Sequence, residues 1–198
     1  MTTLASVAGI SALMAAAATV VGAITLIAFF SRGQPWGTIN DVASIVVMVA
    51  TVPVAYALAS LHGLHQPLAM ITLVEGVVGM AGASIAQALL VAGVRTYEQL
   101  LPWTLGFGAV VGVWYLLVGL LGRGTPLRGG LDLLAIASGI AFIALGYGFL
   151  RGNERHPLSI VGGVVLLVSS TWFLGWLGLD LLAGRLTVGA LGPLEAIS

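Results

Sequence analysis

The sequence predicts an all-α, polytopic membrane protein: a single bundle of six transmembrane helices spanning residues 1–198. Two observations predict this class. Hydrophobic residues make up 59% of the chain, only 7% are charged, and the mean hydropathy is +1.11, whereas soluble domains carry about 25% charged residues. The chain also contains six long apolar runs, and a bilayer core of about 30 Å needs roughly 20 apolar residues per helix.

The first apolar run, Leu4–Phe30, contains an alanine-rich stretch that is also typical of a cleavable secretory signal. It lacks the basic region that precedes such a signal, however, and its apolar part is too long. We therefore expect it to be retained as the first membrane helix. Five further spans are expected, over Val42–Leu61, Leu68–Val94, Trp103–Leu121, Leu133–Leu150 and Leu158–Leu182.

The connectors between the spans are short, so none can form a separate domain. Four of the arginines lie in the first, third and fifth connectors, and three lie on the other side of the bundle. This small excess leans toward an orientation with both termini outside, by the positive-inside rule.

The charged residues are too few and too evenly balanced for several classes of function. The seven basic residues are all arginine, seven residues are acidic, and the net charge is zero, so no basic surface for nucleic acid exists. The chain has no cysteine for thiolate metal sites or thiol nucleophiles, and no lysine for Schiff-base chemistry. We expect no catalytic residues, no metal and no cofactor, and hence no enzyme.

One polar pattern occurs twice at a constant spacing. The stretch SRGQPWGTIND, residues 31–41, is echoed by GRGTPLRGGLD, residues 122–132. The same spacing also relates Asp41 to Asp132, Tyr56 to Tyr147 and His65 to His156. The alternatives are an internal duplication, with copies at about 4–95 and about 103–186, and a chance match in a chain of low complexity.

A duplication would have a topological consequence. Each copy contains three spans, an odd number, so the second copy would enter the membrane from the opposite side. This is a 3+3 inverted-topology repeat, an arrangement that many transporters use. It predicts that Gln34 and Thr125 lie on opposite faces of the membrane.

The repeated polar residues have two interpretations. Asp41 and His65 lie about 36 Å apart along one helix, so they cannot form a pair. In the inverted arrangement, Asp41 shares a face with His156, and Asp132 shares one with His65. They would form a gate of two ion pairs, or each would cap a helix end and complement its macrodipole.

Glu75 is the candidate residue inside a span. It lies about 12 Å beyond Pro67 along the helix, where an ionisable group is a functional-site hypothesis by default. The small residues of the same helical face would let a neighbouring helix approach closely. Glu75 is either a coupling site for a proton or cation, or a structural, protonated carboxyl bonded to Ser169, Ser170 or Thr171.

The segment LAMITLVEGVVGMAGASIAQALLVAGVRTYEQL, Leu68–Leu101, resembles a family of small bacterial multi-pass membrane proteins catalogued as a domain of unknown function. The shared features are a single glutamate in this span, the glycine-containing apolar run after it, and a polar connector like Thr96–Gln99. An arginine that precedes the glutamate in the family is absent here. The resemblance implies a multi-pass bundle in a bacterial plasma membrane and no particular reaction.

Two functions follow as hypotheses. The first is a small transporter-like or channel-like bundle for a small solute or proton, with Glu75 as its coupling site. The alternative is a non-catalytic accessory or assembly subunit, whose glycine-rich faces bind a second copy or another membrane protein. A midplane cavity at Glu75 would favour the first, and a fully packed bundle the second.

Overall fold

The computed structural model describes residues 3–64, 66–123, 127, 129–152, 155–186 and 188. Within these residues the chain forms six α-helices and no strand. All six helices are long and apolar enough to cross a membrane, which confirms the predicted class. The helices are α1 (Thr3–Arg32), α2 (Trp36–Leu61), α3 (Pro67–Val91), α4 (Tyr97–Gly122), α5 (Leu131–Gly152) and α6 (Pro157–Leu182).

Two helices begin earlier than hydropathy predicts. α2 begins at Trp36 rather than Val42, and the side chain of Gln34 accepts a hydrogen bond of 3.1 Å from the backbone N–H of Thr38 in its first turn. α4 begins at Tyr97 rather than Trp103, because Thr96 and Gln99 form a reciprocal capping box. Polar side chains thus extend both helices beyond their apolar runs.

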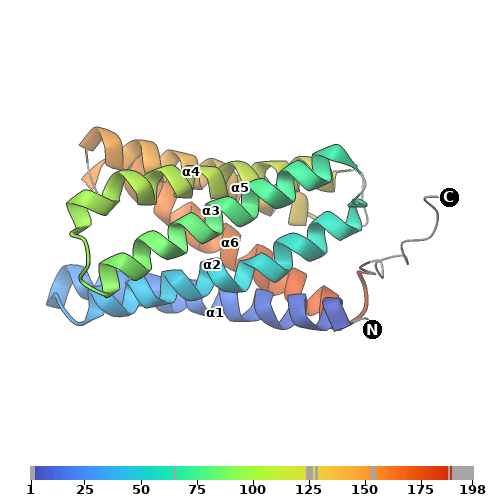
Figure 1. Cartoon of the computed structure of the whole chain (residues 1–198), viewed down its shortest axis with the longest axis horizontal. Helices are drawn as coiled ribbons and strands as arrows, with labels where there is room; N and C mark the ends of the chain where they lie inside the picture. Colours follow the sequence, from blue (N-terminus) through green and yellow to red (C-terminus); the bar gives the residue numbers. More distant parts are fainter. Residues whose placement is uncertain are drawn as a thin grey trace.

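The helices form a closed ring in chain order. Each packs against the helices before and after it, and α1 also packs against α6. Consecutive helices run in opposite directions, as Figure 1 shows, because the connectors between them are short. The connectors α1–α2, α3–α4 and α5–α6 therefore lie at one end of the bundle, and the other two connectors lie at the opposite end.

Glycines set the spacing between neighbouring helices. A Cβ atom at Gly139 of α5 would lie 2.6 Å from the carbonyl oxygen of Gly112 on α4, and one at Gly178 of α6 would lie 2.9 Å from that of Gly9 on α1. Such close backbone approach is typical of helices that associate in membranes. Many glycines are therefore already used in contacts within the chain.

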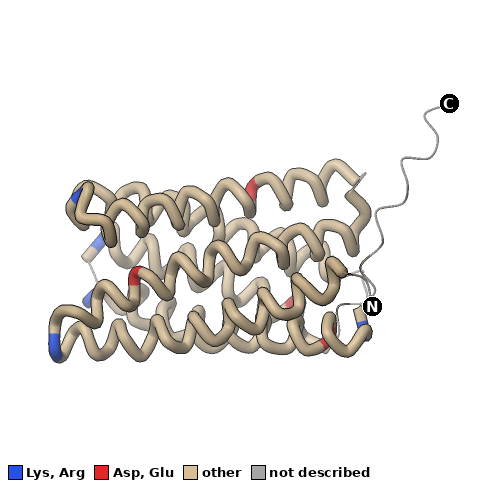
Figure 2. The backbone as a smooth tube through the Cα atoms, turned by 60° about the horizontal axis from the view of Figure 1, so that its bottom comes forward, with Lys and Arg blue, Asp and Glu red and all other residues tan. Residues whose placement is uncertain are grey.

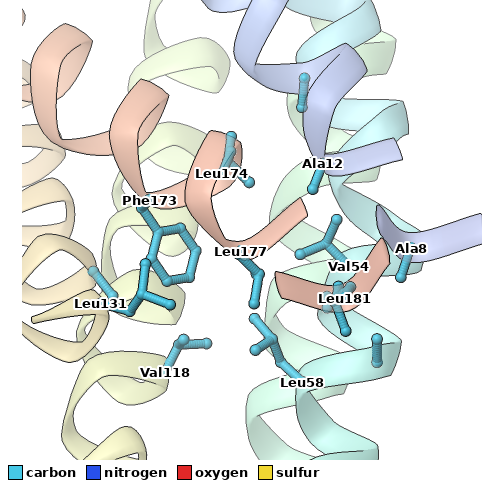
Figure 3. Close-up of a cluster of buried hydrophobic side chains, with 14 of the residues drawn as sticks. Ala8, Ala12, Val54, Leu58, Val118, Leu131, Phe173, Leu174, Leu177 and Leu181 are labelled. Atoms are coloured by element: carbon cyan, nitrogen blue, oxygen red, sulfur yellow. The ribbon is translucent and has the colours of Figure 1, made fainter. Parts of the chain in front are cut away.

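The interior of the ring is filled by side chains. Alanines from α1 and larger residues from the other helices form one buried cluster, which includes Trp114 and Phe173, both fully buried. In Figure 3, Leu177 and Leu181 of α6 reach toward the α2 residues Val54 and Leu58. The bundle is packed through its centre at this level.

The same cap ends α3 and α6. Gly93 and Gly184 follow the two helices with positive φ angles of 67° and 65°. In each case the residue after the glycine donates its backbone N–H back to the helix, from Val94 to the oxygen of Leu89 and from Arg185 to that of Asp180, both at 2.9–3.0 Å. This is the Schellman motif, in which glycine takes the left-handed conformation. These caps fall on Ala-Gly pairs that share the spacing of the predicted repeat.

The charges of the bundle lie mostly at its two ends. In Figure 2 the arginines (blue) occupy the end regions, and the charged positions between the ends are acidic (red). One end carries Arg32, Arg95, Arg151 and Arg155, in or beside three connectors. The predicted orientation depends on the small excess of arginines at this end over the opposite end.

Candidate functional site at the α3–α4 interface

Glu75 lies in the third turn of α3, within the membrane-spanning part of the bundle. Its side chain is half-buried, and its Oε2 atom is fully buried without a hydrogen-bond partner in the part of the chain that the structure describes. Leaving a buried carboxyl oxygen unpaired costs free energy, because neither water nor a donor compensates for the lost hydration. Glu75 is therefore a polar group that the fold itself does not satisfy.

A second unsatisfied group lies on the facing helix at the same level. Trp114 of α4 packs directly over Gly76, the neighbour of Glu75, where a side chain larger than hydrogen would collide with its indole ring. Trp114 is fully buried, and no described residue accepts a hydrogen bond from its Nε1–H. The unpaired Oε2 of Glu75 and the unpaired Nε1–H of Trp114 thus lie at about the same level of the bundle.

The three hydroxyls that the structural interpretation assigns to Glu75 as hydrogen-bond partners do not bond to it. Ser169 donates to the oxygen of Val165 at 2.7 Å and accepts from Ser138 at 2.9 Å, and Ser170 donates to Leu166 at 2.6 Å. The hydroxyl of Thr171 has no hydrogen-bond partner among the described residues. All three are on α6, which packs between α1 and α5, whereas α3 packs between α2 and α4. The order of the helices around the ring therefore separates Glu75 from these hydroxyls.

A groove of about 580 Å³ lies between the same two helices. It is lined from Gly82 to Leu89 on α3 and from Gln99 to Phe107 on α4, with Arg95 from the connector. Glu75 does not line it, but lies two helical turns from Gly82 on the same side of α3. This groove is therefore not the midplane cavity at Glu75 that would favour the transporter hypothesis.

The predicted ion pair between Asp41 and His156 is not formed. Nδ1 of His156 instead accepts the backbone N–H of Leu158 at 3.2 Å, so His156 caps the start of α6. Asp132 lies in the first turn of α5, where its charge complements the helix macrodipole. Asp41 lies beyond the first turn of α2, because that helix starts at Trp36, so the capping interpretation is wrong for Asp41. His65 lies outside the described residues.

The two repeat-related tyrosines lie in different surroundings. Tyr147 is 48% exposed, and its hydroxyl accepts a hydrogen bond of 3.0 Å from Nε of Arg151, whose guanidinium also lies 5.5 Å from the ring centre. Tyr56 is half-buried in α2. The spacing that relates them in sequence therefore does not give them a common environment, and neither lies at the α3–α4 interface.

Sequence reasoning missed one buried carboxylate. Asp180 lies in the expected span Leu158–Leu182; its side chain is 0% exposed and pairs with Nη1 of Arg185 at 3.0 Å. Its second oxygen, Oδ2, has no hydrogen-bond partner among the described residues. The sequence did contain a signal for this ion pair, since an acidic residue is followed by an Ala-Gly pair and then by an arginine. An Ala-Gly cap folds the chain back over the helix end and so brings the arginine to the acid.

No protein-family model, no curated protein and no solved structure matches this chain. The resemblance around Glu75 to a family of bacterial membrane proteins, and with it the bacterial plasma membrane as location, stays a prediction. The candidate site therefore stands on its own geometry. Its central members are Glu75, Gly76 and Trp114.

Proposed function

We propose that this multi-pass membrane protein conducts protons, alone or with a small solute, and that Glu75 is the group that takes up and releases the proton. The observation that carries the proposal is the buried, unpartnered Oε2 of Glu75 inside the third membrane span. An ionisable residue at such a depth is expensive, and residues of this kind mark ion and proton pathways in many membrane proteins.

The surroundings of Glu75 support a group that changes its protonation state. No arginine or histidine pairs with it in the described part of the chain. An ionised Glu75 would therefore have no compensating positive charge among the described residues. A transient donor, such as a water molecule or solute, would bond the carboxylate and lower the cost of releasing the proton.

Trp114, which packs over the neighbouring Gly76, supplies a fixed hydrogen-bond donor at the level of this carboxyl. Its indole cannot leave the interface without losing its packing on Gly76, and its N–H is unused in the described structure. A water molecule or solute oxygen bound here would accept from Trp114 and bond to Glu75. The two side chains would thereby hold one small polar guest between α3 and α4.

The test uses purified protein in liposomes with a pH gradient, a potassium diffusion potential and an internal pH dye. We expect proton flux above that of empty liposomes, a loss of at least about tenfold in Glu75→Gln, and a smaller loss in Trp114→Phe. Glu98→Gln is the matched control, since Glu98 is an exposed carboxylate at the start of α4. Its flux should equal that of the original protein.

A second function, a non-catalytic accessory or assembly subunit, is favoured by the packed interior around Trp114 and Phe173. The same measurement separates the two. If the original protein carries no flux, or if Glu75→Gln carries as much as the original, proton conduction is wrong. Association of the protein with a second copy or another membrane protein would then be the property to measure.

A further inference from the structure

The groove between the C-terminal half of α3 and the first turns of α4 combines an apolar trough with one positive charge. Its floor is formed by buried small and apolar residues, including Ala86 at 4% and Leu100 at 6% exposure. Its flanks are exposed, with Ile85 at 61% and Trp103 at 62%. Trp103 and Phe107 stack along α4 with ring centres 6.2 Å apart and extend the apolar wall.

The polar groups of the groove are confined to one end. Arg95 and Gln99 lie there, where the α3–α4 connector leaves the membrane-spanning part of the bundle. From Gln99 to Phe107 the groove follows α4 for about 12 Å, at 1.5 Å per residue. A charged mouth at the headgroup level therefore continues into an apolar trough at the depth of acyl chains.

Arg95 has no ion-pair partner within the described residues, although a carboxylate lies nearby in sequence. Glu98 neither pairs with Arg95 nor lines the groove. The side chain of Gln99 is engaged in the capping box with Thr96. The guanidinium is thus the available charge of the site, and it is suited to bind a phosphate through two parallel hydrogen bonds.

We infer that this groove is a binding site for one anionic phospholipid of the adjacent leaflet, with the phosphate on Arg95 and an acyl chain along Ala86, Leu100 and Phe107. The volume of about 580 Å³ lies within the range of sites that bind small molecules. The site is independent of proton conduction, because Glu75 does not line it.

The test is native mass spectrometry of the purified protein with phosphatidylglycerol and with phosphatidylcholine of the same chains. We expect the first complex to be tighter, and Arg95→Gln to weaken it about fivefold while leaving phosphatidylcholine unchanged. This factor corresponds to about 1 kcal/mol for one arginine near an anionic headgroup. Arg32→Gln is the matched control, since Arg32 is an exposed arginine at the same end of the bundle and does not line the groove.

A second variant tests the apolar trough. Ile85→Trp places a large ring on an exposed flank of the groove, so the fold should keep its thermal midpoint while phosphatidylglycerol binding falls. Equal losses in Arg95→Gln and Arg32→Gln would mean general charge attraction and would overturn the site. Equal affinity for both lipids, or displacement of the lipid by millimolar glycerol phosphate, would overturn it as well.

Discussion

At the scale of single residues, Glu75 and Asp180 show how differently this fold treats two buried carboxylates. Asp180 has Arg185 at 3.0 Å and forms part of a closed helix end. Glu75 has a buried oxygen with no partner among the described residues, inside the third membrane span. Glu75 was singled out because it lies deep within its span, whereas Asp180 lies near the end of α6, and only the folded cap brings it to Arg185.

His62 gives a prediction at this scale. It follows α2 as its C-cap residue, and burial lowers the pKa of its imidazole below the ordinary value of 6.5. The unfolded chain therefore binds a proton at a higher pH than the folded protein does. Stability should be full above about pH 6.5 and fall as the pH decreases from there, by less than about 1.4 kcal/mol per pH unit.

The measurement for His62 is the thermal midpoint in detergent between pH 7.5 and pH 5. His62→Gln carries no titrating group at this position, so its midpoint should fall less over this range than that of the original protein. Parallel curves for the two proteins would show that protonation of His62 does not govern acid stability. The Nε2 atom of His62, buried without a partner, is the structural reason for the expected difference.

At the scale of elements, hydropathy predicted the six spans but not all of their limits. The apolar parts of α1, α5 and α6 agree closely with the expected runs, because lipid-facing and core-facing residues are both apolar. The starts of α2 and α4 were missed, since Gln34 and Thr96 extend them through polar contacts that hydropathy scores as loop. Part of the candidate site was predicted from the sequence, because Glu75 is an ionisable residue inside a span. Trp114 could not be assigned to the site from the sequence, because its place there depends on α4 packing against α3.

The helix spacing gives a prediction at this scale. Gly139→Ala should destabilise the bundle by about 1–3 kcal/mol, because its Cβ would meet the carbonyl oxygen of Gly112 and backbone cannot move aside as a side chain does. Gly146→Ala on the same helix is the control. A Cβ there has open space, and alanine is the better helix former, so the thermal midpoint should stay or rise.

The measurement is the thermal midpoint of each variant in detergent. Equal midpoints for Gly139→Ala and Gly146→Ala would contradict the close contact of α4 and α5 at Gly139. Comparing the two variants also separates two roles of glycine that the sequence alone does not distinguish: packing within the bundle and contact with a partner helix. The accessory-subunit hypothesis assigned the glycine-rich faces to partner helices. Gly139 and Gly178 are instead used inside the bundle, so a partner helix would have to dock elsewhere.

At the scale of the whole molecule, the closed ring of antiparallel helices is the main result that hydropathy did not supply. Six apolar spans can be arranged in many ways, and the order around the ring depends on glycine contacts such as Gly9 with Gly178. The inverted repeat stays a prediction. Its compatible features are the matching caps after α3 and α6, and the opposite directions of α1 and α4 (Figure 1).

The arrangement of connectors gives the prediction at this scale. Gln34 precedes α2 at one end of the bundle, and Arg123 follows α4 at the other. The chain has no cysteine, so Gln34→Cys and Arg123→Cys each offer a single reactive site. An impermeant maleimide added to intact cells should label one variant, and the other should react only after permeabilisation.

Labelling of both positions from the same side would contradict the order of the membrane crossings. Arg123 serves for this test because Thr125, the residue related to Gln34 by the predicted repeat, lies outside the described residues. The side on which Gln34 is labelled would also fix the orientation.

The contact between α1 and α6 also constrains how the protein is made. α1 leaves the ribosome before the other five helices of the bundle, yet one of its two neighbours, α6, is made after all of them. Until Pro157–Leu182 has been synthesised, the alanine face of α1 has only α2 to cover it, and the unfinished bundle has two open edges, α1 and α5. A nascent chain that stops before α6 therefore presents unpaired helix surfaces to the insertion machinery and to membrane proteases.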